Sequence, residues 1–554
     1  MRVAVIVPLC SALGLVAAGV PASARADCEA PFEVGGAPVD LHLRMSRAVW
    51  DDLRFAALEG EGCAAQYPYR EVEFRCGEEE PWIAIAARHK RGDQRGLDTD
   101  QKPPLKLDFN RVVQGQRWPA ALGELGFRRL SLNNGQPDNP GGVLSALLTE
   151  YVAWQVMHAE VPTAGRAAHA RLTVHFTDDD AVEYHGLYIL IEDVDRTTVR
   201  SRYGTEEGTL YKTTTGSCRD EVVFDDGAPN AAADAVAAWS ALDPADFAGS
   251  WAERTEEAVD LEELLRHEAL RDVLGNAADT VLGQNYSNYY AFDQRAGRRH
   301  YLPWDLDDAF RPYPQSAPPD SPLEASCSPI GALTRCVPEV RQRYLEISCQ
   351  LANGSLAEER LLAAFASLDA AVRPVVQEED DLVWPEDDPF DPTVEGTYAW
   401  QLAELESWIP ARIQFVRAAI SAEGLECPDG CPDGASEPCQ YLRCAGERRC
   451  EDGRWTTCLV DGALEDPDNL LDDDCDGAVD EGASDGEPDA GAGDEEAPGG
   501  GVGSCGCSHG QSPGGVALFL IALCWWRRGQ RRLATRQPPS SPAHQELPRP
   551  ARTW

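Results

Sequence analysis

The order of hydrophobic patterns along the chain predicts an α+β domain whose second half is mainly helical. Stretches in which apolar and polar residues alternate predict β-strands, and they lie at 82–90, 104–110, 170–176, 185–194, 287–293 and 299–306. Stretches with a helical period predict α-helices, and they lie at 141–158, 260–279, 358–372 and 398–422. The resulting order is strands, a helix, strands and then mostly helices.

Length and composition indicate one large domain with appendages. The chain has 554 residues, which is more than one ordinary hydrophobic core accommodates. A hydrophobic content of 43%, with 14 Trp, 15 Tyr and 14 Phe, is enough to build a core. The formal net charge of -44 argues against a nucleic-acid partner, because phosphate contacts need clustered Lys and Arg. Such a charge suits divalent cations and the solvated surface of an exported protein.

Residues 1–26 have the pattern of a secretory signal peptide. Arg2 forms a short positive region, an apolar run follows, and Ala24-Arg25-Ala26 provides a small-residue cleavage site. The mature chain is therefore expected to begin at Asp27 and to be exported.

The cysteines predict disulfide bonds. Of the 18 cysteines, 14 lie between Cys28 and Cys475, and export to an oxidising compartment favours their pairing, although the sequence does not give the connectivity. Zinc binding by Cys427 and Cys431 is the weaker alternative, because no His lies in residues 426–460.

Composition divides the chain into consecutive parts. The segments after the signal peptide are a globular domain at 27–425, a Cys-rich disulfide region at 426–460, an acidic segment at 461–482, a disordered linker at 483–503, an anchor segment at 504–534 and a polar tail at 535–554. The anchor contains an apolar run of 13 residues, Gly514–Trp526. This run is shorter than the ~20 residues of a spanning helix, and the Arg cluster after it agrees with the positive-inside rule.

A cluster of acids comes after the last predicted strand. Asp305, Asp307 and Asp308 lie directly after "YLPW". Carboxylates at the end of an apolar strand are either solvated turn residues or ligands for a cation. The local pattern leaves both interpretations open.

Basic residues occur at two positions where they could bind phosphate groups: in a loop between two predicted strands and inside an apolar strand. The stretch "RHKRGDQRG" puts Arg88, Lys90, Arg91 and Arg95 in a Gly-containing loop between two predicted strands, either as a phosphate cradle or as a basic hairpin loop. Lys106 lies inside an apolar strand, and strand alternation places it on the face opposite Leu105 and Leu107. Its alternative role is that of an edge-strand Lys facing water.

Several motifs, in this order, resemble the spore-coat protein H (CotH) kinase family of exported atypical protein kinases over much of 80–420. They are "RHKRGDQRG" with "KPPLKLDFN", "LSLNNGQPDNPGGVLSALLTEYVAWQV", "YHGLYILIEDVD" with "GTLYK", "GNAADTVLGQNYSNYYAF" and "YLPWDLDDAF". The resemblance implies an atypical protein-kinase-like domain at 27–425. It also implies phosphoryl transfer from ATP, with Mg²⁺ or Mn²⁺, to Ser or Thr of a surface or coat protein.

The resemblance implies a role for several acids and amides. Asp279 corresponds to the catalytic Asp that orients the substrate hydroxyl. Asp305 corresponds to the metal-binding Asp that comes after a strand, and the W-D-x-D pattern of the family is intact. Asn288 or Asn285 supplies the metal-binding amide. Position 284, five residues after Asp279, is Gln, so this ligand departs from the pattern of ordinary kinases.

The resemblance also implies which residues contact the nucleotide. Lys106 is expected to pair with Glu150 of the following helix, as in the Lys–Glu arrangement of kinases. Lys212 is a second candidate for the phosphate-contacting Lys, and both candidates remain open. The basic loop contributes Arg88, Arg91 and Arg95.

For the other acidic residues near these motifs, we expect supporting rather than catalytic roles. Glu192 and Asp195 are expected to be hinge or structural residues at the end of a buried strand. Asp307 either assists the metal or caps the segment after it, and Asp308 is expected to be a solvated turn residue.

The acidic segment 461–482 resembles the MopE-like metal-binding repeat. Three acids and a glycine form D-x-D-x-D-G, the first half of an EF-hand-type loop that would take Ca²⁺, and they are Asp472, Asp474, Asp476 and Gly477. Position 12 of such a loop is Ala483, so Asp480 or Glu481 would close the site. The alternative is an acidic linker.

The segment 504–534 resembles the MYXO-CTERM surface-sorting signal. The resemblance implies processing near Cys505 or Cys507 and attachment to the outer surface of the cell. An ordinary short membrane anchor is the alternative.

The sequence supports three functional hypotheses. The first is an exported, surface-anchored kinase of the CotH type. The second is a non-catalytic CotH-like surface or adhesion protein that keeps the fold. The third is a calcium-binding surface module without a nucleotide site.

Overall fold

The structure is a computed structural model with two compact units, residues 1–485 and 486–554. It describes 28, 31–32, 38–55, 59, 66–90, 103–134, 145–213, 221–240, 251–275, 288–295, 297–307, 309–310, 337–377, 390–394, 397–427, 434–441, 444–451, 454–455 and 459–460. All of these residues belong to the first unit.

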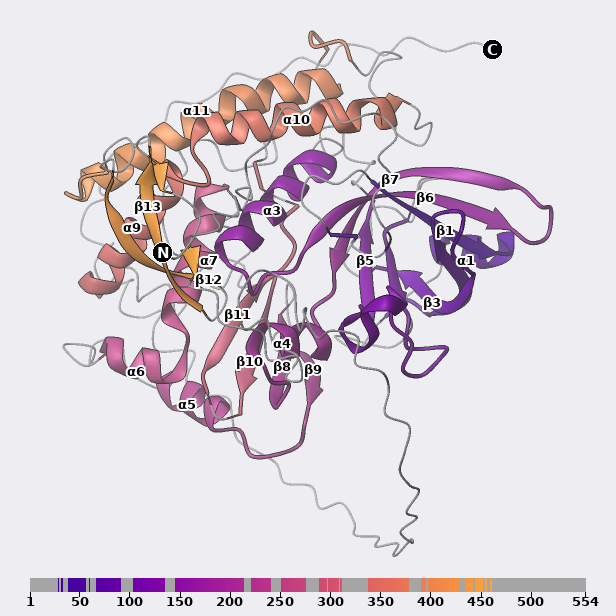
Figure 1. Ribbon diagram of the computed structural model, residues 1–554, viewed down its shortest axis with the longest axis horizontal. Coiled ribbons are helices and arrows are strands. Elements are labelled where there is room, and N and C mark those ends of the chain that lie inside the picture. The colour runs from indigo at the N-terminus through magenta and orange to yellow at the C-terminus, as the bar shows by residue number, and fades with distance from the viewer. Residues whose placement is uncertain are drawn as a thin grey trace, which may run out of the picture. The chain divides into compact units, whose positions relative to one another are not determined.

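Seven strands form a closed barrel in the order β1-β2-β3-β4-β5-β7-β6 (Figure 1). The strands are β1 (Val39–Met45), β2 (Arg70–Cys76), β3 (Ile83–His89), β4 (Leu105–Asp108), β5 (Arg129–Asn133), β6 (Ala167–Phe176) and β7 (Val182–Glu192). Neighbouring strands are antiparallel, except that β1 and β6 pair in parallel and close the barrel. The short helix α1 (Arg47–Phe55) follows β1.

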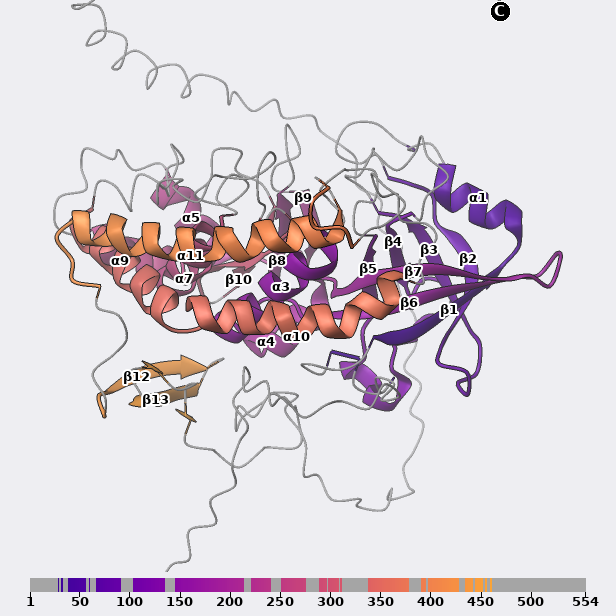
Figure 2. The same cartoon turned by 90° about the horizontal axis from the view of Figure 1, so that it is seen from above.

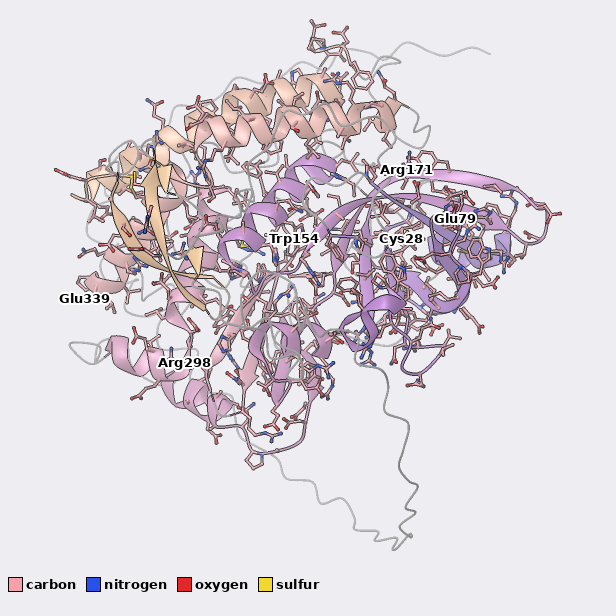
Figure 3. All side chains as sticks on the ribbon, viewed as in Figure 1. Cys28, Glu79, Trp154, Arg171, Arg298 and Glu339 are labelled. Carbon is pink, nitrogen blue, oxygen red and sulfur yellow. A yellow bond between two sulfur atoms is a disulfide. The ribbon has the colours of Figure 1, made fainter. Side chains whose placement is uncertain are left out.

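Strand alternation gives the barrel two different faces. Leu105 and Leu107 of β4 are buried in the barrel core, as the sequence predicts. The opposite face of β7 contributes Leu187, Ile189 and Ile191 to a second core that the helices share. The disulfide Cys28–Cys76 ties the N-terminal segment to the end of β2 (Figure 3).

A second, antiparallel sheet has the strand order β11-β10-β8-β9. Its strands are β8 (Gly208–Thr213), β9 (Glu221–Asp225), β10 (Tyr289–Gln294) and β11 (Arg299–Pro303). The register pairs Lys212 with Tyr290, and Asp293 with both Thr209 and Arg299. We call the end at Lys212 and Asp305 the near end, and the end at Thr209 and Asp293 the far end.

The remaining long elements are helices that share the second core. They are α3 (Tyr151–Glu160), preceded by the π-helical turn η4 (Ser145–Glu150), α4 (Arg196–Tyr203), α5 (Ala231–Ser240), α6 (Trp251–Ala258), α7 (Leu261–Val273), α9 (Pro338–Asn353), α10 (Glu358–Gln377) and α11 (Tyr398–Ala422). Helices α10 and α11 contact each other and run side by side in Figures 1 and 2. The disulfide Cys349–Cys427 joins α9 to the segment after α11.

The helix predicted at 260–279 ends earlier than expected. Asp260 caps its start by accepting from the backbone N–H of Glu263, and α7 ends at Val273. Gly275 follows with φ 75°, a left-handed conformation that glycine adopts without steric cost. Residues 276–287, with Asp279, lie outside the described part of the chain.

The fold confirms the predicted α+β class. Strands occur at all six predicted places, and α11 has the bounds that its periodicity predicts, 398–422. Four further short strands lie in the region predicted to be Cys-rich, and they are β12 (Ser436–Tyr441), β13 (Cys444–Glu451), β14 (Arg454–Trp455) and β15 (Leu459–Val460). None of the helices in the described residues combines the length and apolarity that crossing a bilayer requires.

Candidate functional site

Buried charged side chains lie close together where the outward face of β4 meets the near end of the second sheet. The barrel register places Lys106 opposite Arg88 of β3 and Ser131 of β5. Because Ser131 lies opposite Ile191 of β7, Asp193, two residues later, projects from the same face. Lys106, Ser131 and Asp193 therefore meet on the side of the barrel that faces away from its apolar core.

Lys106 forms an ion pair with Asp193, and its Nζ lies 2.6 Å from Asp193 Oδ2. Burial alone would raise the pKa of Asp193, but the charges of Lys106 and Arg129 outweigh burial and lower that pKa to about 2. The predicted pairing of Lys106 with Glu150 is therefore wrong. The reason is the cross-strand register, which directs Lys106 toward the carboxylate that follows β7.

Glu150 is completely buried at the end of η4 and belongs to a different network. Its Oε1 accepts from Asn133 Nδ2 at 2.7 Å and from Trp154 Nε1 at 3.3 Å, whereas its Oε2 has no hydrogen-bond partner among the described residues. Burial raises the pKa of Glu150 to about 7, with the Lys90 ammonium opposing and the Asp305 carboxylate adding to the shift. Lys90 donates to Asn133 Oδ1 at 2.6 Å, so Asn133 bridges Lys90 and Glu150.

Lys212 lies against aromatic rings. Its Nζ is 5.1 Å from the ring centre of Tyr290 and 4.8 Å from that of Trp304. Burial, together with the neighbouring charge of Lys106, lowers the pKa of Lys212 to about 7. No hydrogen bond or ion pair of Lys212 occurs among the described residues, so cation–π contacts hold this ammonium.

Asp305 follows β11 and is within reach of a basic residue. Lys90 Nζ lies 3.8 Å from Asp305 Oδ1, and 30% of the Asp305 side chain is exposed. Asp305 and Asn288 have φ values of 60° and 59°, which are left-handed conformations uncommon for residues other than glycine. Backbone strain of this kind is concentrated at functional sites.

The basic loop is only partly described. Arg88 lies in β3 and not in the loop, which corrects the predicted placement, because β3 continues to His89. Its guanidinium is 5.2 Å from the ring centre of Tyr69, and its Nη1 donates to the carbonyl of His89. Residues 91–102, with Arg91 and Arg95, lie outside the described residues, as do Asp472, Asp474 and Asp476.

The acids around β7 have structural contacts, as one of the two sequence interpretations expects. Glu192 pairs with Arg166 and Arg202, and these charges outweigh burial and lower the pKa of Glu192 to about 2. Asp195 caps α4 by accepting from the backbone N–H groups of Thr197 and Thr198.

The sequence was compared with protein-family models, and residues 91–416 match the family described as "CotH kinase protein". This match covers more than half of the 554 residues. The chain belongs to the CotH kinase family. Residues Arg88 and Lys90 lie just before the matched segment of this CotH protein. No relative was found among the curated proteins.

Two residues of this candidate site were missed by the sequence interpretation. Asp193 is one of several acids in "IEDVD", and nothing in that run distinguishes the Lys106 partner from Glu192 or Asp195. Asn133, in "LSLNN", has no distinguishing local signal, since its importance arises from the contact of β5 with η4.

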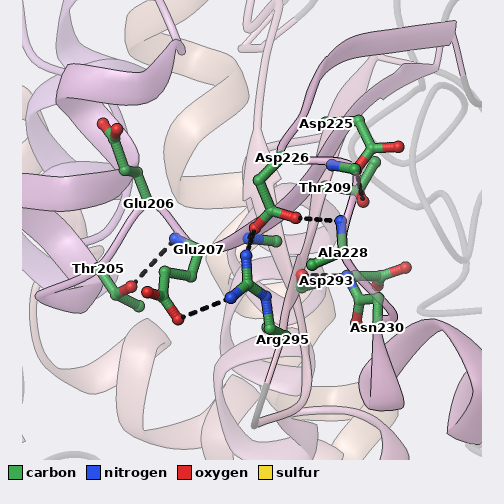
Figure 4. A network of polar contacts seen from close by, with 12 residues as sticks. Thr205, Glu206, Glu207, Thr209, Asp225, Asp226, Ala228, Asn230, Asp293 and Arg295 are labelled. Carbon is green, nitrogen blue, oxygen red and sulfur yellow. Dashed lines mark hydrogen bonds and ion pairs between the residues drawn. The ribbon is translucent and has the colours of Figure 1, made fainter. Parts of the chain in front are cut away.

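The far end of the second sheet is also rich in charge, but there the charges neutralise one another (Figure 4). Arg295 pairs with Asp226 and Glu207, and Asp226 also accepts from the backbone N–H groups of Gly208 and Ala228. Arg299 binds both carboxylate oxygens of Asp293, at 2.6 and 2.8 Å.

Three side chains of the kinds that bind metal ions also lie close together beyond the far end. Ligand atoms of Asp260, Glu263 and His300 lie within 4.8 Å of one another. All three already have partners: His300 bonds Glu263 at 3.0 Å, Asp260 caps α7, and Thr163 and Tyr203 donate to Glu263. Protein contacts therefore already engage each member of this cluster.

The near end therefore has the composition that phosphoryl transfer needs. Three ammonium groups, those of Lys90, Lys106 and Lys212, lie close to the carboxylates of Asp193 and Asp305. Trp304 forms one wall through its contacts with Lys90 and Lys212.

Proposed function

We propose that this CotH protein is an exported, surface-anchored protein kinase that transfers the γ-phosphoryl group of ATP to Ser or Thr of a surface or coat protein. The observation that carries the proposal is the near end itself. There, no carboxylate of the described residues lies within ion-pair distance of Lys212, and the neighbouring Asp305 remains partly exposed.

The cations have different roles in this proposal. Lys106 is already neutralised by Asp193 and acts as a brace between β4 and β7. We assign Lys212 and Lys90 to the phosphate oxygens. Aromatic rings hold Lys212, whereas Lys90 donates to Asn133 at 2.6 Å and lies 3.8 Å from Asp305. Arg91 and Arg95, which lie outside the described residues, are proposed as further phosphate contacts from their sequence alone.

The acids and amides supply the metal-binding and substrate-orienting groups. Asp305 and Asn288 offer the oxygen ligands that Mg²⁺ or Mn²⁺ prefers. The unpartnered Oε2 of the buried Glu150 fits a site that becomes complete when a cation arrives. A bound divalent cation would neutralise and orient the β- and γ-phosphates. Asp279 is the proposed base that orients the acceptor hydroxyl.

Export and surface anchoring belong to the same proposal. The disulfides Cys28–Cys76 and Cys349–Cys427 are the kind of cross-link that persists in oxidising compartments. They support export, and with it the proposed signal peptide at 1–26, whereas the anchor at 504–534 is proposed from its sequence alone. The Asp472–Asp474–Asp476 motif is proposed as a separate Ca²⁺ site on the tether.

Calorimetric titration of ATP with Mg²⁺, and separately with Mn²⁺, tests the nucleotide site. Wild-type protein should bind ATP only with metal, and D305A should lose at least ~100-fold in affinity, since even residues behind metal ligands cost 10–100-fold. D226N, at the far end of the same sheet, is the matched control and should bind as wild type does. Equal ATP binding by wild type and D305A would remove Asp305 from the site.

A non-catalytic surface or adhesion protein is the second candidate function. One observation favours it: Lys106 pairs with Asp193, so the Lys–Glu pair typical of kinases is not formed by Lys106 and Glu150. In this case the titration would give no metal-dependent ATP binding by wild type. A calcium module would instead show Ca²⁺ binding that a triple substitution of Asp472, Asp474 and Asp476 by Asn abolishes.

A further inference from the structure

The two proposed metal ligands share an unusual backbone geometry. Asn288 and Asp305 both have left-handed φ values near 60°. L-residues adopt this conformation only when the surroundings hold it, although Asn and Asp tolerate it better than most. The structure must therefore contain groups that hold both backbones in place.

The guanidinium of Arg271, on α7, contacts both segments. Its Nη2 donates to the carbonyl of Asn288 at 3.0 Å and also to the carbonyl of Trp304. Its Nε donates to Nε2 of His267, one turn earlier on α7, at 3.1 Å. Arg271 is fully buried, so water does not compete for these bonds.

These two carbonyls determine how the ligands are presented. The Trp304 carbonyl belongs to the peptide group before Asp305, so holding that group constrains one side of the φ torsion of Asp305. The Asn288 carbonyl fixes the peptide group after Asn288. It also accepts from the Trp304 N–H at 3.2 Å, which links the two segments directly.

Two converging carbonyl oxygens in a buried place are bound more strongly by a charged donor than by a neutral one. A guanidinium offers several N–H groups in a rigid plane, so one side chain can hold both oxygens in a fixed relation. A Lys ammonium is a flexible point donor and would hold them less firmly.

We propose that Arg271 is a positioning residue, which clamps the carbonyls of Asn288 and Trp304 and thereby presets the divalent-cation site formed by Asn288 and Asp305. This inference rests on the proposed function, because that function makes Asn288 and Asp305 metal ligands. Arg271 itself touches neither the cation nor the nucleotide.

Arg412 of α11 is a matched control within the same molecule. It is also fully buried and also donates to two carbonyls, those of Asp272 at 2.5 Å and Val273 at 3.3 Å. Those carbonyls belong to α7, whose helical conformation is maintained without a clamp. Replacing Arg412 removes a buried Arg without releasing a proposed ligand.

The experiment measures binding of Mn²⁺ alone to the full chain by electron paramagnetic resonance, which reports free Mn²⁺. Because the acidic chain offers other sites, the quantity compared is the binding that D305A abolishes. R271M should lower the affinity of this Asp305-dependent site by ~10–100-fold, as expected for a residue behind metal ligands. R271K should lower it less, and R412M should change it by less than ~3-fold.

The outcomes separate the inference from the proposed function. Absence of Asp305-dependent Mn²⁺ binding in wild type would overturn the proposed metal site, and the inference with it. Wild-type affinity in R271M, or equal losses in R271M and R412M, would overturn the inference alone. If R271M does not fold, R271K and R412K are compared in the same way, and an undiminished affinity in R271K overturns the inference.

Discussion

The two ends of the β11-β10-β8-β9 sheet are both charged, but they differ in how the charge is balanced. At the far end, two Arg side chains lie against carboxylates: Arg295 contacts Asp226, and Arg299 contacts Asp293. At the near end, aromatic rings contact the Lys212 ammonium, and no carboxylate of the described residues lies within ion-pair distance of it. Glu150 Oε2 has no hydrogen-bond partner among the described residues. A paired buried charge is tolerated in a fold, whereas an unpaired buried charge costs stability unless a ligand pairs with it.

This difference gives a general expectation for mutations. Removing a charge at the far end should destabilise the protein, because it leaves a buried partner uncompensated. Removing an unbalanced charge at the near end should stabilise the protein while weakening ligand binding. The signs of the stability changes therefore test the comparison.

The largest expected effect is at the far end. R299M removes both hydrogen bonds to the buried carboxylate of Asp293, and breaking a buried pair typically costs about 3–5 kcal/mol. The free energy of unfolding from urea titration measures this loss. R295M is the control, since the Arg295 pair is more exposed and should cost about 0–1 kcal/mol. Equal losses in the two variants would contradict the assigned roles.

The next largest change in stability is expected for two buried glutamates, of which Glu192 is paired with Arg side chains and Glu150, among the described residues, is not. Burial raises the folded pKa of Glu150 to about 7, above its unfolded value of ~4.3. The unfolded state therefore loses its proton first, and wild-type stability falls as pH rises from ~4.3 to ~7. E150Q should therefore be about 2 kcal/mol more stable than wild type above pH ~7, and no more stable below pH ~4.

E192Q is the matched substitution in a balanced environment. The charges of Arg166 and Arg202 outweigh burial and lower the folded pKa of Glu192 to about 2, so its ionised form contributes stability above pH ~4.3. E192Q should therefore lose about 3 kcal/mol at neutral pH. Urea unfolding of both variants at pH 4 and pH 8 measures the signs, and a loss of stability in both at pH 8 would refute the contrast.

The sequence predicts the elements of this site better than it predicts their contacts. Alternation places Lys106 on the correct face of its strand, opposite the buried Leu105 and Leu107, as the structure confirms. It does not identify Asp193 as the partner, because that choice depends on the register of three strands. Partner choice is a property of tertiary pairing, which local periodicity does not encode.

The sequence also does not predict the left-handed backbone conformations of Asn288 and Asp305. Glycine usually signals a positive φ, but positions 288 and 305 are Asn and Asp. The sequence correctly places Asp305 directly after a strand, since β11 ends at Pro303. It does not reveal that Arg271, a buried residue of α7, holds the backbone on either side of the site.

The smallest predicted change in stability is that caused by replacing Lys212. Its pH dependence is opposite to that predicted for the replacement of Glu150. Burial lowers the folded pKa of Lys212 to about 7, below its unfolded value of ~10.4. The folded state therefore loses this proton first, and wild-type stability rises as pH increases from ~7 to ~10.4. K212M should be about 1 kcal/mol more stable than wild type below pH ~7, and this gain should vanish by pH ~10.

K106M provides the matched control for K212M, because Lys106 is the balanced ammonium of the same site. Its loss leaves the buried Asp193 without its closest partner, so K106M should lose about 3 kcal/mol at neutral pH. Thermal unfolding at pH 6 measures both variants, and calorimetry with ATP and Mg²⁺ measures the functional side. If Lys212 receives phosphate oxygens, K212M should gain stability and lose ATP affinity together. If K212M gains stability but its affinity for ATP is unchanged, the unpaired Lys212 ammonium destabilises the fold as predicted, but it does not bind ATP.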